Sequence, residues 1–200
     1  MAWTQQFADT FTNTQFTSLP THNAAWTNDY NTNRISTAGT RMQPVGAARS
    51  SISTTLADKQ YAQLKIYPSE GALTDGPLIR YTALAATYWG FTGYYARYEE
   101  ADTRINVHRV DNGSATSLGT RTVTLSDGDT LRIEADGSSI TVWVNGVQQG
   151  AAFTDATYSS GQAGFYAEVG GTEWADDFEA GDEAAGAATA PKRFLMLGVG

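Results

Sequence analysis

The stretch from residue 122 to residue 147 reads TVTLSDGDTLRIEADGSSITVWVNGV. Three of its segments, 122–125, 131–134 and 140–144, show the apolar alternation or the short apolar run that is typical of a β-strand. An Asp-Gly pair lies in each interval between them, and Asn145-Gly146 follows the third segment. Such pairs adopt the positive φ angles that hairpin turns require. The stretch therefore predicts three antiparallel strands joined as a meander.

Similar segments recur upstream, at 61–67, 78–84, 93–98 and 103–110, and turn sequences such as Asp111-Asn112-Gly113-Ser114 separate them. No segment has a convincing helical period, although one helical turn would fit in 83–87 or 151–156. Many short strands at regular spacing are typical of a sandwich or jelly roll. We therefore expect an all-β protein, an antiparallel two-sheet β-sandwich.

The two ends of this domain resemble each other in pattern. Segments 7–11 and 174–179 both alternate large aromatic residues with polar ones, which predicts that they pair as neighbouring strands. We expect the sandwich to span residues 1–181. Residues 182–200 then form a flexible linker of small residues and an apolar tail, and Phe194, Leu195, Met196 and Leu197 are the residues expected to anchor the protein to a partner.

Composition excludes several classes of function. The formal net charge is −8, and no Lys or Arg occurs between Gly150 and Ala190. Binding to nucleic acid or to an anionic membrane is therefore not expected. The absence of Cys excludes disulfides and thiolate metal sites, and no apolar run is long enough to cross a bilayer.

The order of these features resembles the concanavalin A-like lectin/glucanase superfamily, and within it the laminin-G-like modules. The resemblance covers roughly residues 7 to 179. Its matching pieces are the opening Phe7-Ala8-Asp9-Thr10-Phe11, the phrase Trp143-Val144-Asn145-Gly146-Val147 and the closing Asp176-Asp177-Phe178-Glu179. It implies a jelly-roll topology but names no ligand.

Hydrolases of that superfamily carry two Glu residues flanking an Asp at alternate positions of one strand, because retaining chemistry needs two carboxylates about 5 Å apart. Adjacent acids such as Glu99 and Glu100 point to opposite faces of a strand and do not fit this pattern. His22 and His108 are the two histidines of the chain, and no nucleophile-elbow sequence accompanies them. We therefore expect a binding protein rather than an enzyme.

Two sets of residues are candidates for ligand contact. The aromatic segment 88–95 suggests a glycan site in which Trp89, Tyr94 and Arg97 face a groove; the alternative is that these aromatic residues fill the core. The resemblance implies that Asp176 and Asp177 could bind calcium at a rim, and the alternative is a solvated acidic edge. No other cofactor is expected. Trp143 is assigned to the core, because it lies within an apolar strand.

The small-residue, Thr-rich sequence and the leucine-rich tail are similar to those of tailed-phage structural proteins. The leading hypothesis is a virion component, such as a capsid decoration or a head or tail appendage, that contacts other virion proteins and host-surface glycans. One alternative is an extracellular lectin-like carbohydrate-binding module, and another is a glycoside hydrolase of the same fold. Whether the protein forms a homo-oligomer stays open.

Overall fold

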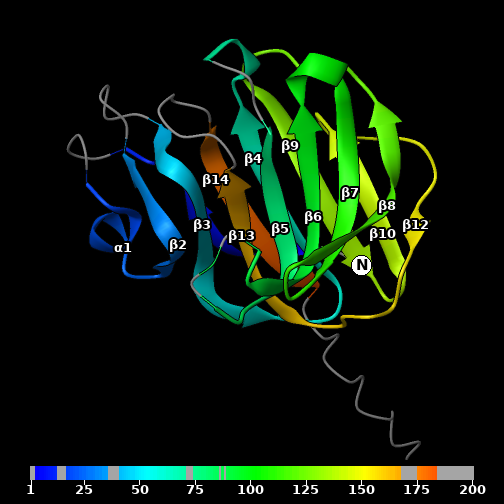
Figure 1. Cartoon of the computed structure of the whole chain (residues 1–200), viewed down its shortest axis with the longest axis horizontal. Coiled ribbons are helices and arrows are strands. Elements are labelled where there is room, and N and C mark those ends of the chain that lie inside the picture. The colour runs from blue at the N-terminus through cyan, green and yellow to red at the C-terminus, as the bar shows by residue number, and fades with distance from the viewer. Residues whose placement is uncertain are drawn as a thin grey trace, which may run out of the picture.

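The computed structural model describes residues 3–12, 17–35, 41–70, 74–85, 87, 89–167 and 175–183. These residues form two antiparallel sheets that face each other, which confirms the expected all-β sandwich (Figure 1). Among the described helices, none is both long and apolar enough to cross a membrane.

The first sheet has the strand order β11-β10-β9-β4-β14-β1. Its strands are β1 (Trp3–Asp9), β4 (Gln60–Ile66), β9 (Asp129–Asp136), β10 (Ser139–Val144), β11 (Val147–Gln148) and β14 (Ala175–Glu183). The short β12 (Phe153–Thr154) pairs with the other end of β10. We call this sheet the terminal sheet, because it contains the first and the last described strands.

The second sheet has the order β2-β3-β13-β5-β6-β7-β8, and we call it the central sheet. Its strands are β2 (Trp26–Ile35), β3 (Met42–Leu56), β5 (Thr74–Ala83), β6 (Phe91–Glu99), β7 (Arg104–Asp111), β8 (Ser114–Thr122) and β13 (Gly161–Ala167). One residue pair, Ala175 of β14 with Met42 of β3, joins the two sheets. The short helix α1 (Leu19–His22) lies beside β2 (Figure 1), and the 3-10 turns are η1 (Pro68–Glu70) and η2 (Glu100–Asp102).

The turn residues place the hairpins where the sequence predicts them. β9 and β10 pair across the turn at Gly137, whose φ is +55°. Asn145 and Gly146 have φ values of +49° and +77°, and they return the chain from β10 into β11. The two ends also pair as expected, because Ala8 of β1 lies opposite Glu179 of β14.

Three sequence predictions differ from the structure. β8 ends at Thr122, so 123–125 is not a strand, and the expected meander loses its first pairing because β8 pairs with β7 whereas β9 pairs with β4 and β10. The one helical turn that would fit in 83–87 or 151–156 does not form in the described residues, while Leu19–His22, which has Pro at the first helical turn, is helical. β14 continues to Glu183, two residues past the expected domain boundary, and residues 184–200 lie outside the described part of the chain.

An aromatic cluster fills the core where the two sheets come together. Trp26 of β2 is 2% exposed, and its ring lies 4.9 Å from that of Phe178 in β14 and 5.1 Å from that of Phe165 in β13. Phe7 and Phe11 pack against the same indole. Residues far apart in the sequence therefore stabilise one another through a shared buried apolar surface.

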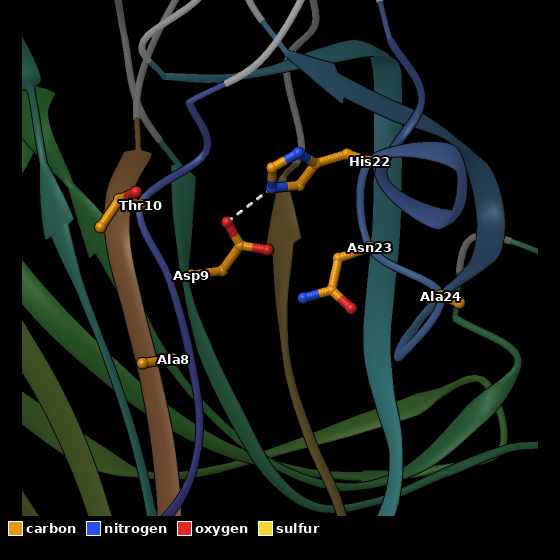
Figure 2. Close-up of a pocket in the computed structure, with 6 residues that line it drawn as sticks. All are labelled: Ala8, Asp9, Thr10, His22, Asn23 and Ala24. Atoms are coloured by element: carbon orange, nitrogen blue, oxygen red, sulfur yellow. Dashed lines mark hydrogen bonds and ion pairs between the residues drawn. The ribbon is translucent and has the colours of Figure 1, made fainter.

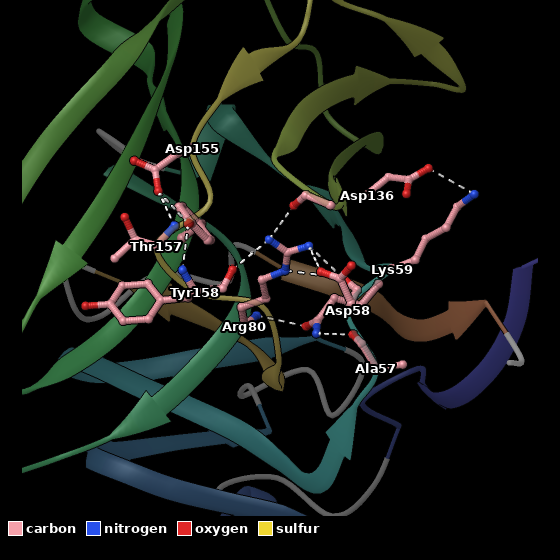
Figure 3. A network of polar contacts seen from close by, with 11 residues as sticks. Ala57, Asp58, Lys59, Arg80, Asp136, Asp155, Thr157 and Tyr158 are labelled. Carbon is pink, nitrogen blue, oxygen red and sulfur yellow. Dashed lines mark hydrogen bonds and ion pairs between the residues drawn. The ribbon is translucent and has the colours of Figure 1, made fainter.

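The buried guanidinium of Arg80 closes one end of the sandwich (Figure 3). It donates hydrogen bonds to the carbonyl oxygens of Asp58, Gly137 and Tyr158, at 2.7, 2.8 and 2.7 Å. These carbonyls belong to three separate connections, so one side chain ties together the β3–β4 turn, the β9–β10 turn and the segment before β13. Planar, multi-donor geometry suits Arg to this role.

Candidate functional site

Of the three residues that the sequence grouped as a glycan site, the structure places two on the outer face of the central sheet and the third on its inner face. Trp89 is half-buried and stacks on Tyr166, at 5.6 Å between ring centroids, on the outer face of the central sheet. Arg97 lies in β6 and pairs with Glu99, which also binds Arg104 at 2.6 Å. Tyr94 points the other way, is fully buried between the sheets, and donates a hydrogen bond to Asp155 Oδ1 at 2.7 Å. Tyr94 therefore does not face a groove.

The two residues that were candidates for calcium also have other partners. Lys65 Nζ lies 2.6 Å from Asp177 Oδ2, and this ion pair raises the pKa of Lys65. The Asp177 amide donates to Asp176 Oδ1 at 2.8 Å, and burial raises the pKa of Asp176 to about 6. Within the described ranges, no three His, Cys, Asp or Glu side chains gather as a metal site. The tail residues Phe194, Leu195, Met196 and Leu197 lie outside the described residues.

A surface of different character lies on the outer face of the terminal sheet. Strand pairing aligns four side chains in one row across it: Trp143 of β10, Arg132 of β9, Gln63 of β4 and Glu179 of β14. Their neighbours in each strand, such as Val142 and Ile133, point into the core. Alternation along the strands therefore produces an outer row that is aromatic at one end and polar along the rest.

Three members of this row line a groove with a volume of about 290 Å³, whose lining residues are Trp3, Gln63, Thr130, Arg132, Glu134, Trp143 and Gly146. We call it the Trp3–Trp143 groove. It continues into a hollow of about 260 Å³ that shares Trp3, Glu134 and Trp143 and also contains Thr141 and Gln148. In the other direction it continues into a hollow of about 300 Å³ that shares Gln63 and Thr130 and reaches Lys65 and Asp177. Each volume is close to the lower end for small-molecule sites.

Packing below the groove fixes the position of Trp3. Its ring meets the ring of Tyr61 edge-on at 5.2 Å, and the Arg132 guanidinium lies 3.7 Å from the Tyr61 centroid and 5.1 Å from that of Trp3. Gly181 makes room for this arrangement, because a Cβ there would lie 2.8 Å from Tyr61 Cε1 and 2.2 Å from the Thr4 carbonyl oxygen. An aromatic ring is thus held on a rigid sheet at the groove.

The polar side chains of the groove hold one another in place. Arg132 Nε lies 2.5 Å from Glu134 Oε1, and Arg132 Nη1 donates to Gln63 Oε1 at 3.3 Å. The Tyr61 hydroxyl donates a short hydrogen bond to Glu179. Burial, and then this bond to Glu179, raise the pKa of Tyr61, which keeps the phenol protonated. The groove therefore offers fixed donors and acceptors between two tryptophan rings.

The sequence contained one signal for this groove that the apolar run obscured. Ile140, Val142 and Val144 are buried in alternate positions, so Trp143 must point outward with Thr141, and its indole N–H donates to Thr141 Oγ1 at 3.1 Å. The assignment of Trp143 to the core was therefore wrong. Trp3 gave no comparable signal, because its neighbours across the sheet depend on strand order.

Solved structures similar to this chain were found at low sequence identity. A Bacillus subtilis protein with a galectin-like fold has a TM-score of 0.69 and 12% identity, over 90% of this chain and 98% of that one. The chain has a galectin-like jelly-roll fold. A lichenase from a mouse hindgut metagenome has a TM-score of 0.61 and 11% identity, over 89% of this chain and 99% of that one. The carbohydrate-binding module CBM66 from Bacillus subtilis has a TM-score of 0.59 and 18% identity, over 77% of this chain and 91% of that one.

No protein-family model matches the chain, and no curated protein matches it either. At these identities, similarity to the solved structures shows the fold alone.

Proposed function

We propose that the protein is a non-enzymatic glycan-binding module, and that the Trp3–Trp143 groove is its binding site. The observation that carries this proposal is the placement of two half-exposed tryptophans in one groove with Gln63, Arg132 and Glu134 between them. A sugar ring has apolar C–H faces that pack on indole rings and hydroxyls that need hydrogen-bond partners. Pockets with aromatic walls and a few fixed polar groups match this chemistry.

The test is binding of the purified chain to mixed-linkage β-glucan, arabinan, xylan and galactomannan, measured by gel retardation and then by calorimetry. We expect Trp143→Ala to weaken binding by about 2 kcal/mol, about thirty-fold in Kd, which is typical of a central tryptophan in an interface. Trp89→Ala is the matched control, because Trp89 is a half-buried tryptophan on the opposite sheet. Loss of binding in Trp89→Ala with full binding in Trp143→Ala would move the site to the central sheet.

Hydrolysis is the second candidate function, because Glu134 and Glu179 both line the groove system, on either side of Gln63. Their oxygens are already occupied: Glu134 pairs with Arg132, and Glu179 accepts from Tyr61 and Gln63. These contacts suit positioned hydrogen-bond acceptors, and they favour binding over proton transfer. Release of reducing ends that Glu134→Gln or Glu179→Gln abolishes would establish the hydrolase instead.

For the location, we propose a virion surface, with the glycan-binding groove turned outward and the C-terminal tail attached to other virion proteins. The support is the apolar sequence from Phe194 to Leu197 after a linker of small residues. The full-length chain with Phe194→Ser and Leu197→Ser tests this by co-sedimentation with phage particles. If the substituted chain co-sediments as well as the original chain, or if the original chain does not co-sediment at all, the extracellular module is favoured instead.

A further inference from the structure

Beyond the Trp3–Trp143 groove lies a fourth hollow, at the outer edge of β1. It has a volume of about 560 Å³ and is lined by Ala8, Asp9, Thr10, His22, Asn23 and Ala24. Ala8, Asp9 and Thr10 also line the hollow that reaches Lys65 and Asp177. The two hollows therefore adjoin at β1, and among the described residues that line both, Ala8 and Thr10 have small exposed side chains that form a ridge between them.

The far side of this ridge is a built polar surface. Asp9 is buried, and its carboxylate accepts hydrogen bonds from the Trp26 indole N–H and the Phe11 amide, both at 2.8 Å. His22 Nε2 lies 2.8 Å from Asp9 Oδ1, so Asp9 fixes the imidazole against the hollow. The Oδ1 of Asn23 accepts the Ala25 amide at 3.0 Å, which leaves the side-chain nitrogen on the Asp9 side (Figure 2).

From β10 to β1 the terminal sheet spans four strand spacings, about 19 Å at 4.7–4.9 Å each. The hollows run across the strands over this distance and end beyond β1. A single terminal sugar would fill one hollow and leave the others empty. A polysaccharide chain that lies across the strands would contact all of them.

The charges along the hollows indicate which class of polysaccharide could bind. Each cation in the groove system is already paired with a carboxylate: Lys65 with Asp177, Arg132 with Glu134, and Lys59 with Asp136 and Glu183. Carboxylates outnumber cations along these hollows, since Asp9 and Glu179 line them as well. The described residues of these hollows therefore offer a uronate or sulfate no cation that lacks a carboxylate partner, and such a group would be repelled.

We infer that the site is an extended cleft for the interior of an uncharged polysaccharide chain, and that its far subsite, at Thr10, His22 and Asn23, lies across the edge of β1. This inference rests on the proposed function. Tryptophans hold the chain at one end, and the small residues Ala8 and Thr10 let it cross the sheet edge at the other.

The test uses a length series, from trisaccharide to octasaccharide, of whichever of the four neutral polysaccharides the full-length protein retains. We expect the octasaccharide to bind about tenfold more tightly than the trisaccharide, the equivalent of about one further well-placed contact. Thr10→Gln places a longer side chain on the ridge, and should reduce octasaccharide affinity to that of the trisaccharide without changing trisaccharide binding. Thr120→Gln, the same change at an exposed position of β8 outside these hollows, is the matched control and should bind both oligosaccharides as the original chain does. Equal melting curves confirm that the variants fold.

Polygalacturonate and alginate serve as anionic comparisons and should not bind at low salt, where charge effects are largest. Equal affinity across the length series, an inert Thr10→Gln, or tight binding of an anionic chain would overturn the extended neutral cleft while leaving glycan binding intact. If none of the four neutral polysaccharides binds and the anionic ones do not either, the proposed function itself fails.

Discussion

Replacement of Arg80 should remove a large part of the stability of this fold. Arg80 is 1% exposed and donates to the carbonyls of Asp58, Gly137 and Tyr158 (Figure 3). In Arg80→Ala these oxygens lose their donors, and each buried unsatisfied group costs about 1–3 kcal/mol. Water can enter the vacated end of the sandwich and recover part of this, so we expect a loss of about 3–5 kcal/mol. The free energy of unfolding of a typical domain is only about 5–15 kcal/mol, so this loss would be a large share of it.

The assay is equilibrium denaturation in urea, followed by tryptophan fluorescence and circular dichroism. Two variants separate the causes. Arg80→Lys keeps the charge but lacks the planar fork, and should still cost at least about 2 kcal/mol. Asp58→Asn removes only an ion pair whose carboxylate is 55% exposed, and should cost less than about 1 kcal/mol. If Asp58→Asn costs as much as Arg80→Ala, the ion pair and not the three carbonyls explains the role of Arg80.

Three further predictions concern the groove and the core. The pKa of Asp176 is raised to about 6, so the folded chain binds one more proton than the unfolded chain between about pH 4 and 6. The free energy of unfolding should therefore rise as pH falls from about 7 towards 4. Asp176→Asn should not show this rise. Gly181→Ala places a Cβ against the Thr4 carbonyl and Tyr61, and should lower the free energy of unfolding by about 1–3 kcal/mol and weaken glycan binding. An unchanged melting temperature would show that β1 adapts. Trp26→Phe removes a donor to buried Asp9 and some core volume, and should cost about 2–4 kcal/mol in urea denaturation, whereas a cost below 1 kcal/mol would mean that Asp9 finds another donor.

Most of the fold could be predicted from local chemistry. Asp136-Gly137 and Asn145-Gly146 fix hairpins within a few residues, and the matching patterns at 7–11 and 174–179 identified one of the long-range pairings, β1 with β14. β2 and β3 were not identified, since their many Thr, Ser and Asn residues give a weak apolar alternation.

The candidate site was much less predictable. Aromatic density favoured 88–95, but Tyr94 and Tyr95 are adjacent in a strand and so lie on opposite faces of the sheet. The groove combines Trp3, Gln63, Arg132 and Trp143 from four strands. Their proximity depends on the order β10-β9-β4-β14-β1, which no local pattern contains. Strand alternation alone could have placed Trp143 and Arg132 outside, but not their neighbours across the sheet.

The most direct test of the glycan-binding groove is a ¹⁵N spectrum of the tryptophan indole N–H groups, recorded while the retained oligosaccharide is added. The chain has five tryptophans, and single substitutions assign their signals. We predict that the Trp3 and Trp143 signals shift and saturate together, while those of Trp26 in the core and Trp89 on the opposite sheet stay in place. Saturable shifts at Trp89, with Trp3 and Trp143 unchanged, would contradict the account.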